Sequence, residues 1–155
     1  SVPLFGTLVG FLEGSIPRFG CVRFPLLENK LIYGDGDKTF EDGKLIHSSN
    51  ETKLKDALIL TSDENRLKRS EYSDKWNKLN ELVSYHRTWG DCYGYYLVCS
   101  GRAQAMIDVD LKPCDILPLI PVIHGAGCEI IELKKPYRDI LVCSKDVYQD
   151  IVKIF

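Results

Sequence analysis

Three aspartates stand at the ends of apolar segments, where a carboxylate is more useful to chemistry than to packing. Asp91 precedes one apolar run, Asp108 closes another, and Asp115 follows Asp108 by seven residues. Carboxylate oxygens are the ligands that Mg²⁺ prefers, and they also pair with amino groups. Asp is equally a common helix cap, because it accepts the free amide protons of a first turn. From the residues alone, a cap explains Asp91 and Asp115 fully.

The segment that contains these acids resembles a known enzyme family. Its motifs are Arg87-Thr88-Trp89-Gly90-Asp91, Ser100-Gly101-Arg102, Pro113-Cys114-Asp115 and Gly125-Ala126-Gly127. Together they are similar to the C-terminal half of the inositol monophosphatase superfamily of magnesium-dependent phosphatases, and to its histidinol-phosphate phosphatases in particular. The resemblance extends over nearly the whole chain. It implies an αβαβα sandwich, to which this chain would contribute part of the large antiparallel sheet and the C-terminal α/β layer.

The resemblance implies a catalytic role for Asp115. The superfamily signature Trp-Asp-x-Ala-Ala lies at this place, and its Asp both binds Mg²⁺ and orients the water that attacks phosphorus. On that basis Asp115 is the expected catalytic residue and the expected metal ligand. Cys114 stands where the signature has Trp, and Leu117-Pro118 stand at its small residues. Catalysis would be metal-assisted hydrolysis of a phosphate monoester.

The same resemblance implies a substrate site. Trp89, Gly90 and Asp91 stand where most relatives have a Gly-Ser-Ala or Gly-Thr-Ala turn facing the substrate, and they resemble the histidinol-phosphate branch. There the Asp91 carboxylate would pair with the substrate amino group, and Asp108 matches a family acid that hydrogen-bonds hydroxyl or amine groups. The expected ligand is a small phosphorylated metabolite. Inositol phosphate or another sugar phosphate is the alternative substrate.

Most of the superfamily's metal ligands have no counterpart in this sequence. They come from a Gly-Glu-Glu segment and an Asp-Pro-x-Asp-Gly-Thr loop, and that loop normally precedes a strand similar to Ser1-Val2-Pro3-Leu4-Phe5-Gly6. We therefore expect the chain to be a fragment that is inactive alone and needs the missing N-terminal half or a partner chain. The rival interpretation is a non-catalytic remnant or assembly module of the same fold.

The composition limits the other classes of function. Of 155 residues, 45% are hydrophobic and 27% charged, which is typical of a globular domain and excludes a disordered chain. The net charge of −2 gives no reason to expect a nucleic acid or an anionic membrane as a partner. No apolar run approaches the roughly 20 residues that span a bilayer. We expect a cytoplasmic protein with reduced cysteines and, by the resemblance, a homodimer.

The expected elements change in type along the chain. Up to residue 46 it predicts strands, with one hairpin formed by residues 4–13 and 19–25 and another around Asp42-Gly43. A short helix start follows at residues 50–54. Beyond it, strands at 57–61, 85–88, 103–108, 128–133 and 140–143 alternate with helices at 71–83, 91–99, 115–124 and 145–155, which is typical of an α/β fold. We therefore expect two domains, residues 1–56 and residues 57–155.

Overall fold

The first part of the chain folds into an antiparallel meander. The computed structural model describes residues 2–155, and its first sheet has the order β1-β2-β3-β4-β5. These strands are Thr7–Glu13, Ile16–Phe24, Lys30–Gly34, Thr39–Glu41 and Lys44–Ile46. Asp42 and Gly43 both have positive φ, 48° and 80°, as a tight hairpin turn requires. Both predicted hairpins are confirmed.

The second sheet is mixed and has the order β7-β6-β8-β10-β9. Its strands are β6 Leu58–Thr61, β7 Tyr85–Arg87, β8 Ala105–Asp108, β9 Glu129–Lys134 and β10 Asp139–Cys143. Strand β6 runs parallel to β7 and β8, and β10 runs antiparallel to β8 and β9. The carboxyl ends of β6 and β8 therefore meet at one edge of the sheet, and ligands commonly bind there.

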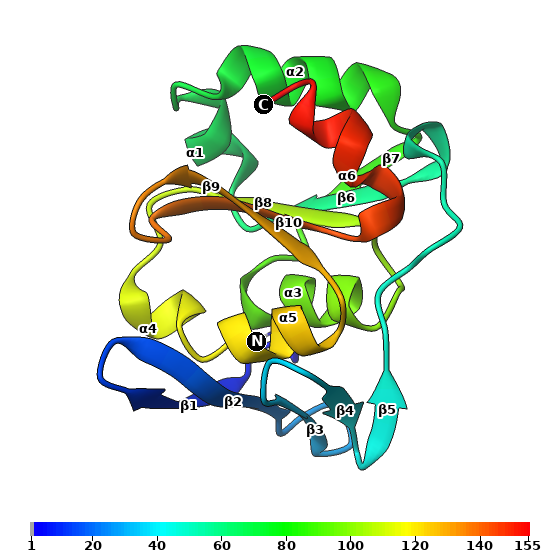
Figure 1. Cartoon of the computed structure of the whole chain (residues 1–155). Coiled ribbons are helices and arrows are strands. Elements are labelled where there is room, and N and C mark those ends of the chain that lie inside the picture. The colour runs from blue at the N-terminus through cyan, green and yellow to red at the C-terminus, as the bar shows by residue number, and fades with distance from the viewer. Residues whose placement is uncertain (1) are drawn as a thin grey trace.

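Helices cover both faces of the second sheet (Figure 1). Helices α1, α2 and α6 lie on one face, and α3, α4 and α5 lie between the two sheets. Their bounds are Glu64–Lys68, Ser73–Leu82, Asp91–Cys99, Pro113–Ile116, Ile120–Gly125 and Lys145–Val152, and the 3-10 turn η1 spans Leu54–Asp56. The described chain therefore forms four layers in the order helices, sheet, helices, sheet, and the α/β class predicted from the sequence is confirmed.

Each face of the second sheet has its own apolar core. Leu60, Met106 and Val142 point between the two sheets, where they meet Phe24 of the first sheet. The neighbouring residues in these strands point the opposite way, against the outer helices, as Ile107 does. Because side chains alternate along a strand, consecutive apolar residues are what a sheet buried on both faces requires.

A row of three glycines lets the first sheet approach the middle helices closely. Gly10 pairs with Gly20, and Gly20 pairs with Gly34, so the row crosses β1, β2 and β3. A Cβ on Gly20 would lie 1.7 Å from the carbonyl oxygen of Pro118, and a Cβ on Gly34 would lie 2.9 Å from the Cα of Val122. The backbone between α4 and α5 therefore lies directly on the sheet.

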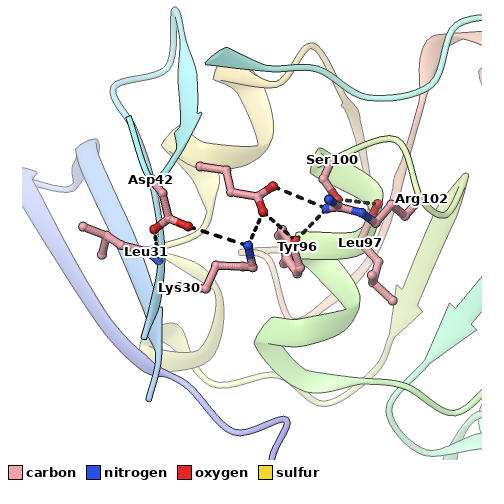
Figure 2. A network of polar contacts seen from close by, with 8 residues as sticks. Lys30, Leu31, Asp42, Tyr96, Leu97, Ser100 and Arg102 are labelled. Carbon is pink, nitrogen blue, oxygen red and sulfur yellow. Dashed lines mark hydrogen bonds and ion pairs between the residues drawn. The ribbon is translucent and has the colours of Figure 1, made fainter. Parts of the chain in front are cut away.

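A polar network ties the first sheet to α3 (Figure 2). The half-buried Glu41 accepts hydrogen bonds from Lys30, from the Tyr96 hydroxyl at 3.0 Å and from Arg102 at 3.4 Å. Burial opposes ionisation of Glu41, but the bonds from Lys30 and Tyr96 outweigh it and lower the pKa of this carboxyl. Arg102 also lies over the Tyr96 ring, with 5.2 Å from its guanidinium carbon to the ring centre.

The structure corrects several element predictions. The helix start expected at residues 50–54 lies later, because residues 50–53 are not helical and the helical turn spans Leu54–Asp56. Helix α1 was not predicted. The helix expected over residues 115–124 is two helices, α4 and α5. Pro118 and Pro121 lack the amide protons that a continuous helix would use there. Across residues 2–155, no helix has the length and apolar character needed to span a bilayer.

Candidate active site

A cavity of about 330 Å³ lies where the carboxyl ends of β6 and β8 meet the start of α3, helix α4 and the segment that leads into β1. Asp91, Asp108 and Asp115 all line it. These acids come from three different elements, α3, β8 and α4, and the fold gathers them at one place. Trp89 and Gly90 are not among the lining residues. Trp89 is 44% exposed, and its contact with substrate stays a prediction.

Asp108 is the buried acid of the cavity. It ends β8 and is 4% exposed. Its Oδ1 accepts a hydrogen bond from the Ser62 amide at 2.9 Å, and its Oδ2 accepts bonds from the Ser62 hydroxyl and the Tyr95 hydroxyl, both at 3.0 Å. Burial raises the pKa of Asp108 to about 6, although these three donors act to lower it. The group is therefore ionised at neutral pH and protonated in mild acid.

Asp91 begins helix α3 in an unusual backbone conformation. Its φ is 50°, in the left-handed region that is rare for residues with a side chain. The cap residue of the helix is Gly90, so Asp91 is the first helical residue and not the cap that the sequence suggested. The Asp91 amide donates to the Ser62 hydroxyl at 2.8 Å. Gly90 packs against Ser62, whose Cα would lie 2.1 Å from a Cβ on Gly90.

Asp115 lies in the first turn of the short helix α4 and is exposed. The helix begins at Pro113 after the cap residue Lys112, so Asp115 does not open it. Its Oδ2 accepts a hydrogen bond from the Lys112 amide at 3.0 Å. Its Oδ1 lies 3.6 Å from the thiol sulfur of Cys114. The carboxylate is thus oriented by its own helix and keeps accepting capacity towards the cavity.

Comparisons with known proteins identify the family of the chain. The model of the inositol monophosphatase family matches residues 1–150. The chain belongs to this family. It is 34% identical over 131 residues to a bifunctional phosphatase, IMPL2, chloroplastic, of Arabidopsis thaliana, a match that covers 84% of this chain and 37% of the relative. It is 28% identical over 127 residues to a histidinol-phosphatase of Chlorobaculum parvum, covering 81% of this chain and 49% of the relative.

Solved structures of this family share the fold. An inositol monophosphatase from Zymomonas mobilis superposes with a TM-score of 0.87 at 23% identity, over 98% of this chain and 62% of that protein. The present chain therefore spans between about a third and two thirds of the length of these relatives. The family and the homologues are phosphatases. The cavity is therefore a cavity in the fold of a phosphatase family.

The inositol monophosphatase family is typically metal-dependent, and the residues of this chain fit part of a metal site. The carboxylate of Asp115 is oriented and exposed, as a Mg²⁺ ligand requires. Among residues 2–155, however, no three His, Cys, Asp or Glu side chains are grouped as a metal site would need. Among the described residues, the chain thus offers one oriented carboxylate to a metal ion, which would need further oxygen ligands to complete its coordination.

Several cavity residues were not predicted from the sequence. Ser62, Asp63, Arg66 and Tyr95 line it alongside the predicted acids, and Asp110 adds a further carboxylate. Arg66 is the one arginine or lysine among the lining residues of the described chain, and its nearest carboxylate, that of Asp63, is 3.8 Å away. Ser62 and Asp63 directly follow β6, as Asp108 ends β8, so the rule that sites lie at strand ends could have found them.

Proposed function

We propose that this chain is part of a magnesium-dependent phosphate monoester hydrolase whose substrate carries an amino group, as histidinol phosphate does. The observation that carries the proposal is that Asp91, Asp108 and Asp115 line one cavity. Five aspartates and one arginine line this space, so its field favours a cationic group on the substrate. A phosphate ester without such a group would be repelled unless a metal ion compensated the charge.

The proposed metal is Mg²⁺, with Asp115 as one of its ligands. A solved structure of the same fold, an IMPase/NADP phosphatase complexed with Mg²⁺ and phosphate, superposes with a TM-score of 0.80 over 97% of this chain. When bound, Mg²⁺ would stabilise the charge that develops on the phosphate. The Lys112 amide holds the Asp115 carboxylate in place, and we propose that this carboxylate also orients the attacking water.

Asp91 and Asp108 would hold the part of the substrate away from the phosphate. A carboxylate and an ammonium group form a charge-assisted hydrogen bond, which a neutral inositol hydroxyl would replace with a weaker one. Asp108 would be ionised at neutral pH, where it could accept such a bond. Inositol phosphate therefore remains the alternative substrate, with the same catalytic residue and lower expected affinity.

A second function from another class is a non-catalytic assembly module. It is favoured by the sequence around Asp115, where Cys114 stands at the signature Trp and Leu117 and Pro118 stand at its small residues. We propose that the 155 residues alone do not turn over substrate, because Asp115 is the one residue of this chain that matches a metal ligand of the family. Homodimer formation and a cytoplasmic location remain predictions alongside it.

The test is phosphate release by the protein as its own cell makes it. Histidinol phosphate and inositol monophosphate are compared as substrates, with Mg²⁺ and with a chelator, and the 155-residue chain is assayed in parallel. We expect Mg²⁺-dependent release that is faster from histidinol phosphate and absent for the short chain. Faster release from inositol phosphate would favour the alternative substrate. No release from either compound by the natural protein would favour the assembly module.

A further inference from the structure

Ser62 connects two of the cavity acids through a single side chain. It directly follows β6, with Asp108 at the end of the neighbouring strand β8 and Asp91 at the start of α3. Its hydroxyl lies 3.0 Å from Asp108 Oδ2 and 2.8 Å from the Asp91 amide nitrogen. Its amide nitrogen lies 2.9 Å from Asp108 Oδ1. Ser62 thus makes hydrogen bonds to both residues, and Tyr95 of α3 adds a further bond to Asp108 Oδ2.

The direction of these bonds is fixed by chemistry. An amide can only donate, so the Ser62 oxygen accepts from Asp91, and its one proton is then free to go to the carboxylate. The Asp108 Oδ2 receives that proton and a second one from Tyr95, whereas Oδ1 receives only the Ser62 amide proton. A carboxylate oxygen accepts about two hydrogen bonds, so the remaining capacity of Asp108 lies on Oδ1.

The same serine holds the backbone of Asp91 in place. A φ of 50° costs energy for a residue with a side chain and persists only where surrounding contacts impose it. The hydrogen bond from the Asp91 amide to Ser62 is one such contact, and the close packing of Gly90 on Ser62 is another. Ser62 therefore positions Asp91 from two sides.

We propose that Ser62 is a positioning residue that presents Asp91 and Asp108 to the cavity as a fixed pair, which receives the amino group of the substrate. The inference deepens the proposed function and rests on it for the identity of the ligand. It assigns to Ser62 no contact with the phosphate and no part in the attack on phosphorus.

The charged groups around Asp108 define what a change at Ser62 should do. From α3 it faces Asp91 and Tyr95, and the other titratable groups that line the cavity are Asp63, Arg66, Cys92, Asp110 and Asp115. The Ser62 hydroxyl bond favours the ionised form of Asp108, so its removal should raise the pKa of this carboxyl. As the solution is acidified, Asp108 should then become protonated at a higher pH than in the unchanged protein. Substrate binding that needs ionised Asp108 should be lost at that higher pH.

The experiment compares Ser62→Ala with Tyr95→Phe in the natural protein. Ser62→Ala removes the hydroxyl bonds to Asp108 Oδ2 and to the Asp91 amide and keeps the bond from its own amide to Asp108 Oδ1. Tyr95→Phe removes only a donor to Asp108 and keeps the buried ring. Ser84→Ala is the control, because Ser84 is exposed and its hydroxyl bonds the Lys55 carbonyl, away from the cavity. KM and kcat for histidinol phosphate are measured from pH 5 to 8. In parallel, NMR follows the titration of Asp108 and the amide exchange of Asp91.

We expect Ser62→Ala to raise KM by about tenfold, the effect of one lost hydrogen bond of about 1.4 kcal/mol. The acidic limb of the pH profile of kcat/KM should move to higher pH. Tyr95→Phe should move the acidic limb with a smaller rise in KM, and only Ser62→Ala should speed exchange of the Asp91 amide. An unchanged KM and Asp108 titration in a folded Ser62→Ala protein would overturn the inference. If the natural protein releases no phosphate, the proposed function fails, and the NMR measurements still decide whether Ser62 positions the two acids.

Discussion

At the scale of single residues, Asp115 is the group on which hydrolysis should depend most. Asp115→Asn removes the charge but keeps an oxygen that can accept the Lys112 amide proton. In the natural protein, we expect phosphate release to fall by about 10² to 10⁴ fold, the usual range for loss of a catalytic acid or base, and stability to change by less than about 1 kcal/mol. Phosphate release and thermal unfolding measure the two effects. Asp37→Asn, in an exposed turn, is the matched control, and an undiminished rate would remove Asp115 from the site.

The raised pKa of Asp108 should make the free energy of unfolding depend on pH. Its pKa in the folded protein is about 6, above the ordinary value of 3.8. Between these values the unfolded chain loses the proton while the folded protein keeps it, so stability falls as pH rises from about 4 to about 6 and then levels off. Each pKa unit corresponds to about 1.4 kcal/mol. Asp108→Asn should abolish this slope in denaturant unfolding, and an identical slope in the variant would contradict the shift.

At the scale of elements, the glycine row should govern how the α4–α5 segment is held. Gly20→Ala would place a methyl group 1.7 Å from the Pro118 carbonyl oxygen, so the backbone must move. We expect a loss of about 2 to 4 kcal/mol, in the upper range for single substitutions, together with lower activity because Pro118 follows Asp115 closely. Gly14→Asn is the control, since Gly14 has a φ of 61° and open space around it. Unfolding of the two variants in denaturant should differ clearly, and equal midpoints would show that the sheet yields.

Local rules predicted much of the fold, and long-range packing accounts for what they missed. The Asp42-Gly43 hairpin follows from two adjacent residues that tolerate positive φ, so sequence alone was sufficient. The break between α4 and α5 carried a signal in Pro118 and Pro121, but the place of the break depends on Gly20, about a hundred residues earlier.

The residues of the candidate site were likewise predicted only in part from the sequence. The family resemblance identified both Asp108 and Asp115. By contrast, nothing in the sequence distinguishes Ser62 from any other serine after a strand. Its role depends on Asp91 and Asp108, which reach it only through the pairing of β6 with β8 and the packing of α3.

At the scale of the whole molecule, one face of the first sheet carries apolar side chains that the described chain leaves open. Phe11 pairs with Phe19, and Phe40 pairs with Leu45, across the strands. Tyr33 continues the row, with its ring centre 6.3 Å from that of Phe19 and 5.3 Å from that of Phe40. Phe11 is 62% exposed. The opposite face holds the glycine row and the core, so this sheet is apolar on both faces.

A contiguous apolar face of this kind favours association in water. We expect the isolated 155-residue chain to self-associate with rising concentration, and Val9→Thr with Phe11→Thr to weaken that association by about tenfold or more. The reason is that both side chains are more than half exposed, at 58% and 62%, and lie on this face. Sedimentation velocity over a concentration series measures the effect. Leu82→Thr with Tyr85→Thr is the control pair, because both residues are exposed and apolar but lie elsewhere, Leu82 at the end of α2 and Tyr85 in β7, the edge strand of the second sheet. Equal weakening by both pairs would show that association follows total exposed apolar area, and a monomeric chain at all concentrations would refute the prediction.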